Sequence, residues 1–105
     1  MKIAISSLGN TLESKVDPRF GRAHGFIIFD TESGSFEYVD NSSNLSLMQG
    51  AGIQTAQFIA DMGVDVAVSG SFGPKAASVL ERAGIKMVSV GEGLSVRDAI
   101  KKVVN

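Results

Sequence analysis

The stretches MGVDVAVSG, residues 62–70, and AGIKMVSVG, residues 83–91, repeat one pattern that indicates the fold. In each stretch a glycine suited to the end of a helix leads directly into a mostly apolar, β-branched run, as expected of a buried strand. Two successive helix–strand units predict right-handed crossovers onto a parallel sheet. Before the glycine of each stretch, apolar side chains recur at helical spacing, at Ile53, Ala56, Ile59 and Ala60 and again at Ala76, Ala77, Val79, Leu80 and Ala83.

The chain after the second stretch predicts a third helix. Ser95 and Asp98 form a capping box with aspartate in place of the usual glutamate. Pro74 is likewise suited to the first position of the helix between the two stretches. The third helix has an apolar face with i, i+3, i+4, i+7 and i+8 spacing, made of Val96, Ala99, Ile100, Val103 and Val104.

The chain before the first stretch predicts three strands. Residues 3–5 form a short apolar run, as in a buried strand. Residues 25–30 and 36–40 are rich in aromatic and β-branched side chains and flank a polar turn with Gly34, which indicates an antiparallel hairpin. Residues 41–50 are expected to form a polar loop.

We therefore predict an α/β fold with a mixed five-stranded sheet, the element order β-β-β-α-β-α-β-α, and helices on both faces. The continuous apolar character of the first strand places it at the centre of the sheet. We expect the hairpin on one side of it and the parallel strand at residues 64–68 on the other. At 105 residues the chain is expected to form one domain, residues 1–105.

The composition narrows the possible functions. The formal net charge is −1, so no overall field attracts nucleic acid or an anionic membrane, and neither is an expected partner. The chain has no cysteine, which excludes disulfides, thiolate nucleophiles, zinc fingers and cysteine-ligated iron–sulfur clusters. It has no signal-peptide pattern and no run of about 20 apolar residues, so a soluble cytoplasmic protein is expected.

The segment SGSFGPK, residues 69–75, has the best local pattern for binding an anion. It follows a predicted parallel strand, and ligands of open α/β sheets bind beyond the carboxyl ends of such strands. Its glycines let backbone N–H groups turn outward, and the next helix presents the positive end of its dipole. An ordinary strand-to-helix turn is the alternative, and we interpret the similar segment 49–52 as a tight turn. The candidate binding residues are Ser69, Gly70, Ser71, Gly73 and Lys75.

The segment VDPRFGRAHGF, residues 16–26, is longer and more basic than a connection between strands requires. Its two guanidinium groups suit a phosphate, a carboxylate or a polyanionic cluster, with an ion pair to Asp17 as the structural alternative. Phe20 is expected to anchor the loop in the core. A lone histidine is more often structural than a metal ligand. The candidate binding residues are Arg19, Phe20, Gly21, Arg22 and His24, with His24 also the candidate metal ligand.

The sequence has little equipment for catalysis. It has one histidine, no thiol, no nucleophile elbow and no carboxylate on the first strand, so we predict that it is not an enzyme. Asp30 and Asp40 are interpreted as turn residues. The methionines are weak metal ligands, and two of them, Met62 and Met87, are expected in the core; the others are Met1 and Met48.

Together, KIAI (residues 2–5), DPRFGRAHGF (17–26) and the long stretch from GAGIQ to AGIKM (50–87) resemble the nitrogenase iron–molybdenum cofactor biosynthesis accessory family. The resemblance covers nearly the whole chain. The combination of R-F-G-R, G-A-G-I-Q and G-x-x-G-P-x-A is more specific than any one of them. The resemblance implies a ribonuclease-H-like α/β fold and a non-catalytic carrier of iron–sulfur or iron–molybdenum cluster precursors.

The resemblance also bears on the site residues. Members tied to nitrogenase often have His where this chain has Arg19, and many relatives have Cys where Ala23 stands. We hypothesise a small carrier in which the R-F-G-R segment and the SGSFGPK turn cradle an anionic ligand. That ligand is unidentified from the sequence; a transiently bound iron–sulfur or iron–molybdenum cluster is the candidate. Cluster-assembly proteins are candidate partners, and we expect a monomer or a weak homodimer.

Two alternatives remain open at this point. The chain could be a protein–protein interaction domain with no cofactor, or a hydrolase-like enzyme on the same fold. An open, basic, glycine-lined cleft would favour the carrier. A flat apolar patch with the loop packed shut would favour the interaction domain, and converging carboxylates would favour the enzyme.

Overall fold

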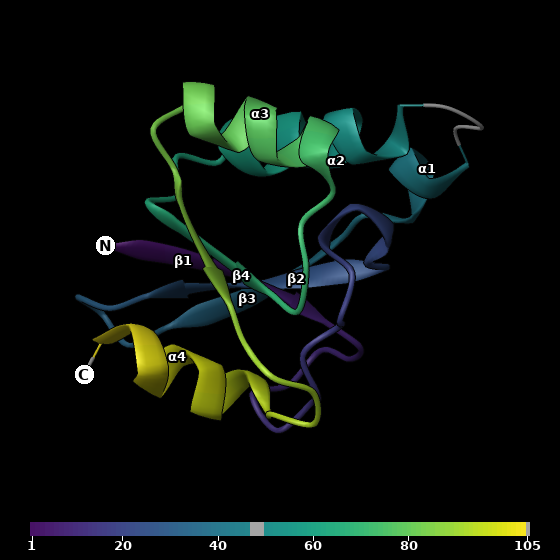
Figure 1. Ribbon diagram of the computed structural model, residues 1–105. Helices are drawn as coiled ribbons and strands as arrows, with labels where there is room; N and C mark the ends of the chain where they lie inside the picture. The colour runs from purple at the N-terminus through teal and green to yellow at the C-terminus, as the bar shows by residue number, and fades with distance from the viewer. Residues whose placement is uncertain (47–49, 105) are drawn as a thin grey trace.

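The computed structural model describes residues 1–46 and 50–104, which form a five-stranded sheet between two layers of helices (Figure 1). No helix of the described residues is long and apolar enough to cross a membrane. The strand order in the sheet is β3-β2-β1-β4-β5. The strands are β1 (Lys2–Ser7), β2 (Gly25–Asp30), β3 (Phe36–Asp40), β4 (Val66–Ser69) and β5 (Lys86–Ser89). The helices are α1 (Ser42–Leu45), α2 (Ala51–Ala60), α3 (Pro74–Arg82) and α4 (Val96–Val104), with a 3-10 turn, η1 (Phe20–Arg22).

Strand β1 is central, as predicted. It pairs antiparallel with β2 along its whole length, from Lys2 opposite Asp30 to Ser7 opposite Gly25. On its other side it pairs in parallel with β4, which in turn pairs in parallel with β5. Residues 3–5 are fully buried because both faces of this strand are covered, which explains their continuous apolar character.

The helices cover both faces of the sheet, as predicted. Helices α2 and α3 lie above the sheet in the view of Figure 1, and α4 lies below it. The core between the sheet and helices α2 and α3, called the first core, contains Ile59 and Leu80. The core between the sheet and α4, called the second core, contains Val96 and Ile100. Met62 and Met87 pack against the first core, also as predicted. The expected position of Val104 on the apolar face is wrong, because it is 46% exposed at the end of α4.

Residues 8–24 form a long loop between β1 and β2. Its turn η1 places Phe20 in the first core with none of its surface exposed. The Phe20 ring meets Phe26 edge-on and lies tilted against Phe72, with 5.1 Å between ring centroids in both pairs. Phe20 therefore anchors the loop, as predicted.

The prediction of a polar loop over residues 41–50 is wrong in part, because Ser42–Leu45 form α1. One helical turn is too short to show an apolar period, so the sequence carries no signal for it. Asp30 and Asp40, interpreted from the sequence as turn residues, are the last residues of β2 and β3. Each accepts the backbone N–H two residues ahead, so their side chains stabilise the turns that follow. Met48 and Gln49 lie outside the described residues.

Candidate anion-binding site

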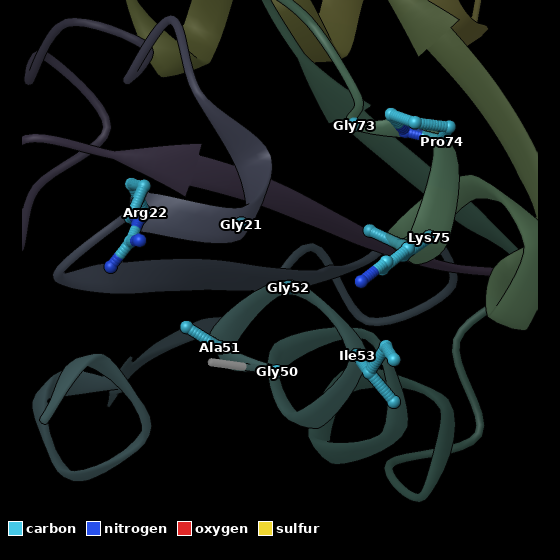
Figure 2. Close-up of a pocket in the computed structure, with 10 residues that line it drawn as sticks. Gly21, Arg22, Gly50, Ala51, Gly52, Ile53, Gly73, Pro74 and Lys75 are labelled. Carbon is cyan, nitrogen blue, oxygen red and sulfur yellow. The ribbon is translucent and has the colours of Figure 1, made fainter. Parts of the chain in front are cut away.

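A cleft of about 420 Å³ opens where the long loop meets the first turns of α2 and α3 (Figure 2). A neighbouring hollow of about 310 Å³ shares part of this lining and adds Arg19, Phe20 and Ser71. The structure thus brings the R-F-G-R segment and the SGSFGPK turn together. The cleft is lined by Gly21, Arg22, Gly50, Ala51, Gly52, Ile53, Gly73, Pro74, Lys75 and Ala76.

Glycines allow the loop to approach α2 this closely. A Cβ atom added to Gly21 would lie 3.1 Å from the Cα atom of Gly52, which leaves almost no room for a side chain. Gly50, just before α2, has a φ of +82°, a left-handed conformation that favours glycine. Four of the ten residues that line the cleft are glycines, so part of its wall is bare backbone.

Helices α2 and α3 both begin at the cleft. The first N–H groups of a helix have no partner inside it, and they lie at the positive end of the helix dipole. Gly50 and Gly73 occupy the N-cap positions, and neither helix has a side-chain cap among the described residues. Donors from two helix ends are thus available at one cleft, an arrangement that suits an anion.

Helix α4 shows the contrasting case on the opposite face of the sheet. Its first three N–H groups all have partners inside the protein, so it has no donor left for a ligand. The N–H of Val96 donates to the Ser14 carbonyl (2.8 Å), that of Arg97 to the Leu12 carbonyl (2.9 Å) and that of Asp98 to the Ser95 hydroxyl (3.1 Å).

Positive side chains stand around the cleft. Figure 2 shows Arg22 and Lys75 on opposite sides of it, with the start of α2 between them. Arg19 lines the neighbouring hollow, and all three side chains are exposed. No acidic residue is among the described residues that line either space. The charged side chains of the described lining are therefore all positive, although the net charge of the chain is −1.

The structural alternative for the arginines, an ion pair between Asp17 and Arg19 or Arg22, is not formed in the described part of the chain. Asp17 is 3% exposed, and its Oδ1 atom accepts a hydrogen bond from the backbone N–H of Arg19 at 2.9 Å. Within residues 1–46 and 50–104 the one salt bridge joins Arg97 to Glu13, at 2.7 Å. The arginines of the loop are thus left to interact with an anion.

The polar side of the SGSFGPK turn holds the loop. Ser69 is fully buried, and its hydroxyl donates to the Asp17 carbonyl at 3.2 Å. Ser71 donates to the Pro18 carbonyl at 2.9 Å and also lines the neighbouring hollow. A Cβ atom on Gly70 would lie 2.7 Å from the Cα atom of Pro18, so glycine is required there. That these three residues contact a ligand stays a prediction.

His24 lies outside the lining of the cleft. It is exposed, and its backbone carbonyl accepts a hydrogen bond from the N–H of Asn41 at 2.8 Å. In the described part of the chain, no three His, Asp or Glu side chains gather into a group that could hold a metal ion. Its role as a metal ligand stays a prediction.

The start of α2 belongs to the cleft, which sequence reasoning missed. The interpretation of residues 49–52 as a mere tight turn left out Gly50, Ala51 and Gly52, which line the cleft. Ile53, expected on the buried face of the helix, is 38% exposed and lines the cleft. The available signal was a second glycine-rich helix start, similar to the one in SGSFGPK.

The groups in the cleft determine what it can hold. Its described lining offers backbone N–H groups, a guanidinium and an ammonium, but no thiolate, imidazole or carboxylate. These groups fit an anion bound by charge and hydrogen bonds. A metal cluster would fit only as a preformed anion that brings its own bridging sulfide and other ligands.

The fold and the cleft define a class, a small α/β module with a mixed sheet and a cationic, glycine-lined cleft at the start of two helices. The chain matches the dinitrogenase iron–molybdenum cofactor family over residues 1–105, and it belongs to this family. The family assignment made from the sequence is therefore confirmed.

Several relatives are similar to this chain over nearly its whole length. The apo form of the orange protein from Desulfovibrio gigas is 45% identical with a TM-score of 0.94, over 98% of this chain and 86% of that one. A NifB-like protein from Thermotoga, solved by NMR, is 36% identical with a TM-score of 0.83, over 97% and 85% of the two chains. An uncharacterized protein of Methanocaldococcus jannaschii is 35% identical, over 96% of this chain and 83% of its own.

Proposed function

We propose that this protein is a small, non-catalytic carrier that holds an anionic ligand, an iron–sulfur or iron–molybdenum cluster precursor, in the cleft between η1 and the starts of α2 and α3. The observation that carries the proposal is the meeting of two helix N-termini without side-chain caps and two cations, Arg22 and Lys75, at one open cleft. Such a site stabilises negative charge from several directions.

The relatives support the identity of the cargo. The family is described by the iron–molybdenum cofactor of dinitrogenase, and the similar chains include a NifB-like protein and a protein solved in an apo form. Cluster-assembly proteins are accordingly the proposed partners. The ribonuclease-H-like assignment of the fold belongs to the same proposal.

The chemistry of the cleft supports a carrier over an enzyme. Its described lining contains no carboxylate, imidazole or thiol that could act as a general base or nucleophile. A cluster without thiolate bonds to the protein is held by charge and hydrogen bonds alone. It can therefore leave intact, as delivery to another protein requires.

The test is anaerobic binding of a synthetic iron–sulfur cubane dianion, followed by absorption spectroscopy and metal analysis after gel filtration. Wild-type protein should retain the dianion, with an affinity that falls as salt is raised. Arg22→Ala/Lys75→Ala should bind it at least tenfold more weakly, because a tenfold loss corresponds to only ~1.4 kcal/mol. Lys101→Ala/Lys102→Ala is the matched control, since it removes the same charge from α4 on the opposite face.

The outcomes separate the hypotheses. Equal losses in both double variants would mean that net charge, and not the cleft, attracts the dianion. Wild-type protein that binds no dianion would reject the carrier and favour the interaction domain. A His24→Ala variant extends the test, because weaker cluster retention is expected if its imidazole is a ligand.

A further inference from the structure

The R-F-G-R turn is held at its beginning by two buried hydroxyl groups. Ser6 and Ser69 stand at the carboxyl ends of the neighbouring strands β1 and β4, and neither has any exposed surface. Their oxygens are 2.9 Å apart, and they lie 2.7 Å and 3.2 Å from the Asp17 carbonyl oxygen, which accepts from both. The Ser6 hydroxyl also lies 3.5 Å from the Val68 carbonyl oxygen, a longer contact than the other three, so the shorter contacts are expected to keep at least one donor on the Asp17 carbonyl. We call Ser6 and Ser69 the first clip.

The turn is held at its end by a buried amide. Asn41 is fully buried, and its side-chain N–H₂ donates to the Ala23 carbonyl and to the Thr55 hydroxyl, both at 2.9 Å. Its carbonyl oxygen accepts from the side chain of Asn44 at 2.7 Å. Thr55 is also fully buried and belongs to α2, the helix that begins at the cleft. We call Asn41 and Thr55 the second clip.

The two clips bracket the residues that reach the cleft. Between Asp17 and Ala23, the turn η1 carries Gly21 and Arg22 into the lining of the cleft. None of the four clip side chains is among the residues that line it. Any influence of the clips on a ligand must therefore act through the backbone that they hold.

Burial makes these hydrogen bonds decisive for the position of the turn. A buried carbonyl that loses its donor has no water to replace it, so the held arrangement is strongly preferred. A binding segment that is ordered in advance loses less entropy when the ligand arrives. The first clip ties the turn to the sheet and the second ties it to α2, which fixes Arg22 relative to the helix ends.

We propose that Ser6, Ser69, Asn41 and Thr55 are positioning residues that pre-order the R-F-G-R turn for anion binding. The inference rests on the proposed function. It also assigns Ser69 a role different from direct ligand contact, since its hydroxyl faces Asp17 and not the cleft.

The test compares Ser6→Ala/Ser69→Ala with each single variant, using the cubane dianion and inorganic phosphate as probes. Each single variant keeps one donor for Asp17 and should bind nearly as well as wild type. The double variant should bind about tenfold more weakly and show faster hydrogen exchange at the amides of residues 19–22. Ile100→Val is the control. Ile100 belongs to α4 and lies in the core on the other face of the sheet, so the change should lower the melting temperature without altering the R-F-G-R turn.

The second clip gives an independent pair of variants, should the double variant not fold. Thr55→Val removes the hydroxyl at constant shape and should weaken binding, whereas Thr55→Ser keeps the hydroxyl and should restore it. Unchanged affinity and unchanged amide exchange at residues 19–22 in the clip variants would overturn the positioning role alone. Wild-type protein that binds neither probe would overturn the proposed function, and the positioning role with it.

Discussion

Gly70 and Gly73 belong to the same turn, but they differ in what surrounds them. A Cβ atom at Gly70 would meet the backbone of Pro18 at 2.7–2.8 Å, while nothing lies within 4 Å of one at Gly73. We expect Gly70→Ala to lower the free energy of unfolding by about 1–3 kcal/mol, because the loop backbone must move away. Gly73→Ala, the matched control, creates no clash and should cost less, up to about 1 kcal/mol, because alanine is a poorer N-cap residue than glycine.

Denaturant unfolding of the two glycine variants checks this expectation. Equal stability of Gly70→Ala and wild type would show that the loop and the turn are not in this close contact. The exchange rates of the amides at residues 19–22 give a second measurement. They should rise in Gly70→Ala and stay unchanged in Gly73→Ala.

The first N–H groups of helix α4 have hydrogen-bond partners, one of them a side-chain hydroxyl, whereas α2 and α3 have no side-chain cap within the part of the chain that the structure describes. Ser95→Ala removes the hydroxyl that accepts from the Asp98 N–H, which should cost about 1 kcal/mol of stability. Affinity for the cubane dianion should not change, because α4 does not line the cleft. Ser43→Ala, an exposed serine of α1, is the control for stability.

Melting temperature and dianion affinity, measured on the same preparations, decide this prediction. A loss of affinity in Ser95→Ala without loss of fold would mean that the anion site extends to the α4 side of the sheet. An unchanged melting temperature would mean that the carbonyls of Leu12 and Ser14 are sufficient to cap the helix.

Helices and strands with a clear pattern of apolar residues were predictable from the sequence, and those without such a pattern were not. The central position of β1 follows from the unbroken apolar run at residues 3–5, and α4 follows from its spacing. Helix α1 has a single turn and no period. The contact between Gly21 and Gly52 joins two glycines that are distant in the sequence, and no local pattern reveals which helix start a loop will meet.

The sequence indicated which residue types gather at the candidate site better than it indicated what each side chain contacts there. The sequence singled out Arg22 and Lys75, and the structure places both in the lining of one cleft; that they bind a ligand stays a prediction. It could not tell whether Ser69 would face a ligand or the protein, because a hydroxyl suits both and the path of the loop decides. The same limit applies to Asp17, whose carboxylate caps the Arg19 N–H in place of pairing with a guanidinium.

At the scale of the whole molecule, the cleft lies at the border of the core beneath α2 and α3, since Ala76 belongs to that core and also lines the cleft. The cores on the two faces of the sheet are complete without a ligand, and every buried side-chain polar atom of the described residues has a hydrogen-bond partner. Folding therefore does not depend on the cargo, unlike the folding of small domains that need a structural metal. The protein isolated in air is expected to be folded, colourless and free of metal.

Ligand binding should nevertheless raise the melting temperature, because the cleft exists only in the folded state. At a hundredfold excess over Kd the dianion should add ~2.7 kcal/mol, a shift on the order of 10 °C for a domain of this size. Anaerobic melting curves with and without the cubane dianion measure the shift, and Arg22→Ala/Lys75→Ala should show little of it at the same concentration. Because the cleft offers charge and hydrogen bonds without thiolates, the shift should shrink as salt is raised. A shift that is insensitive to salt, or a cluster that stays bound through aerobic purification, would contradict electrostatic retention and require a direct protein ligand to the metal.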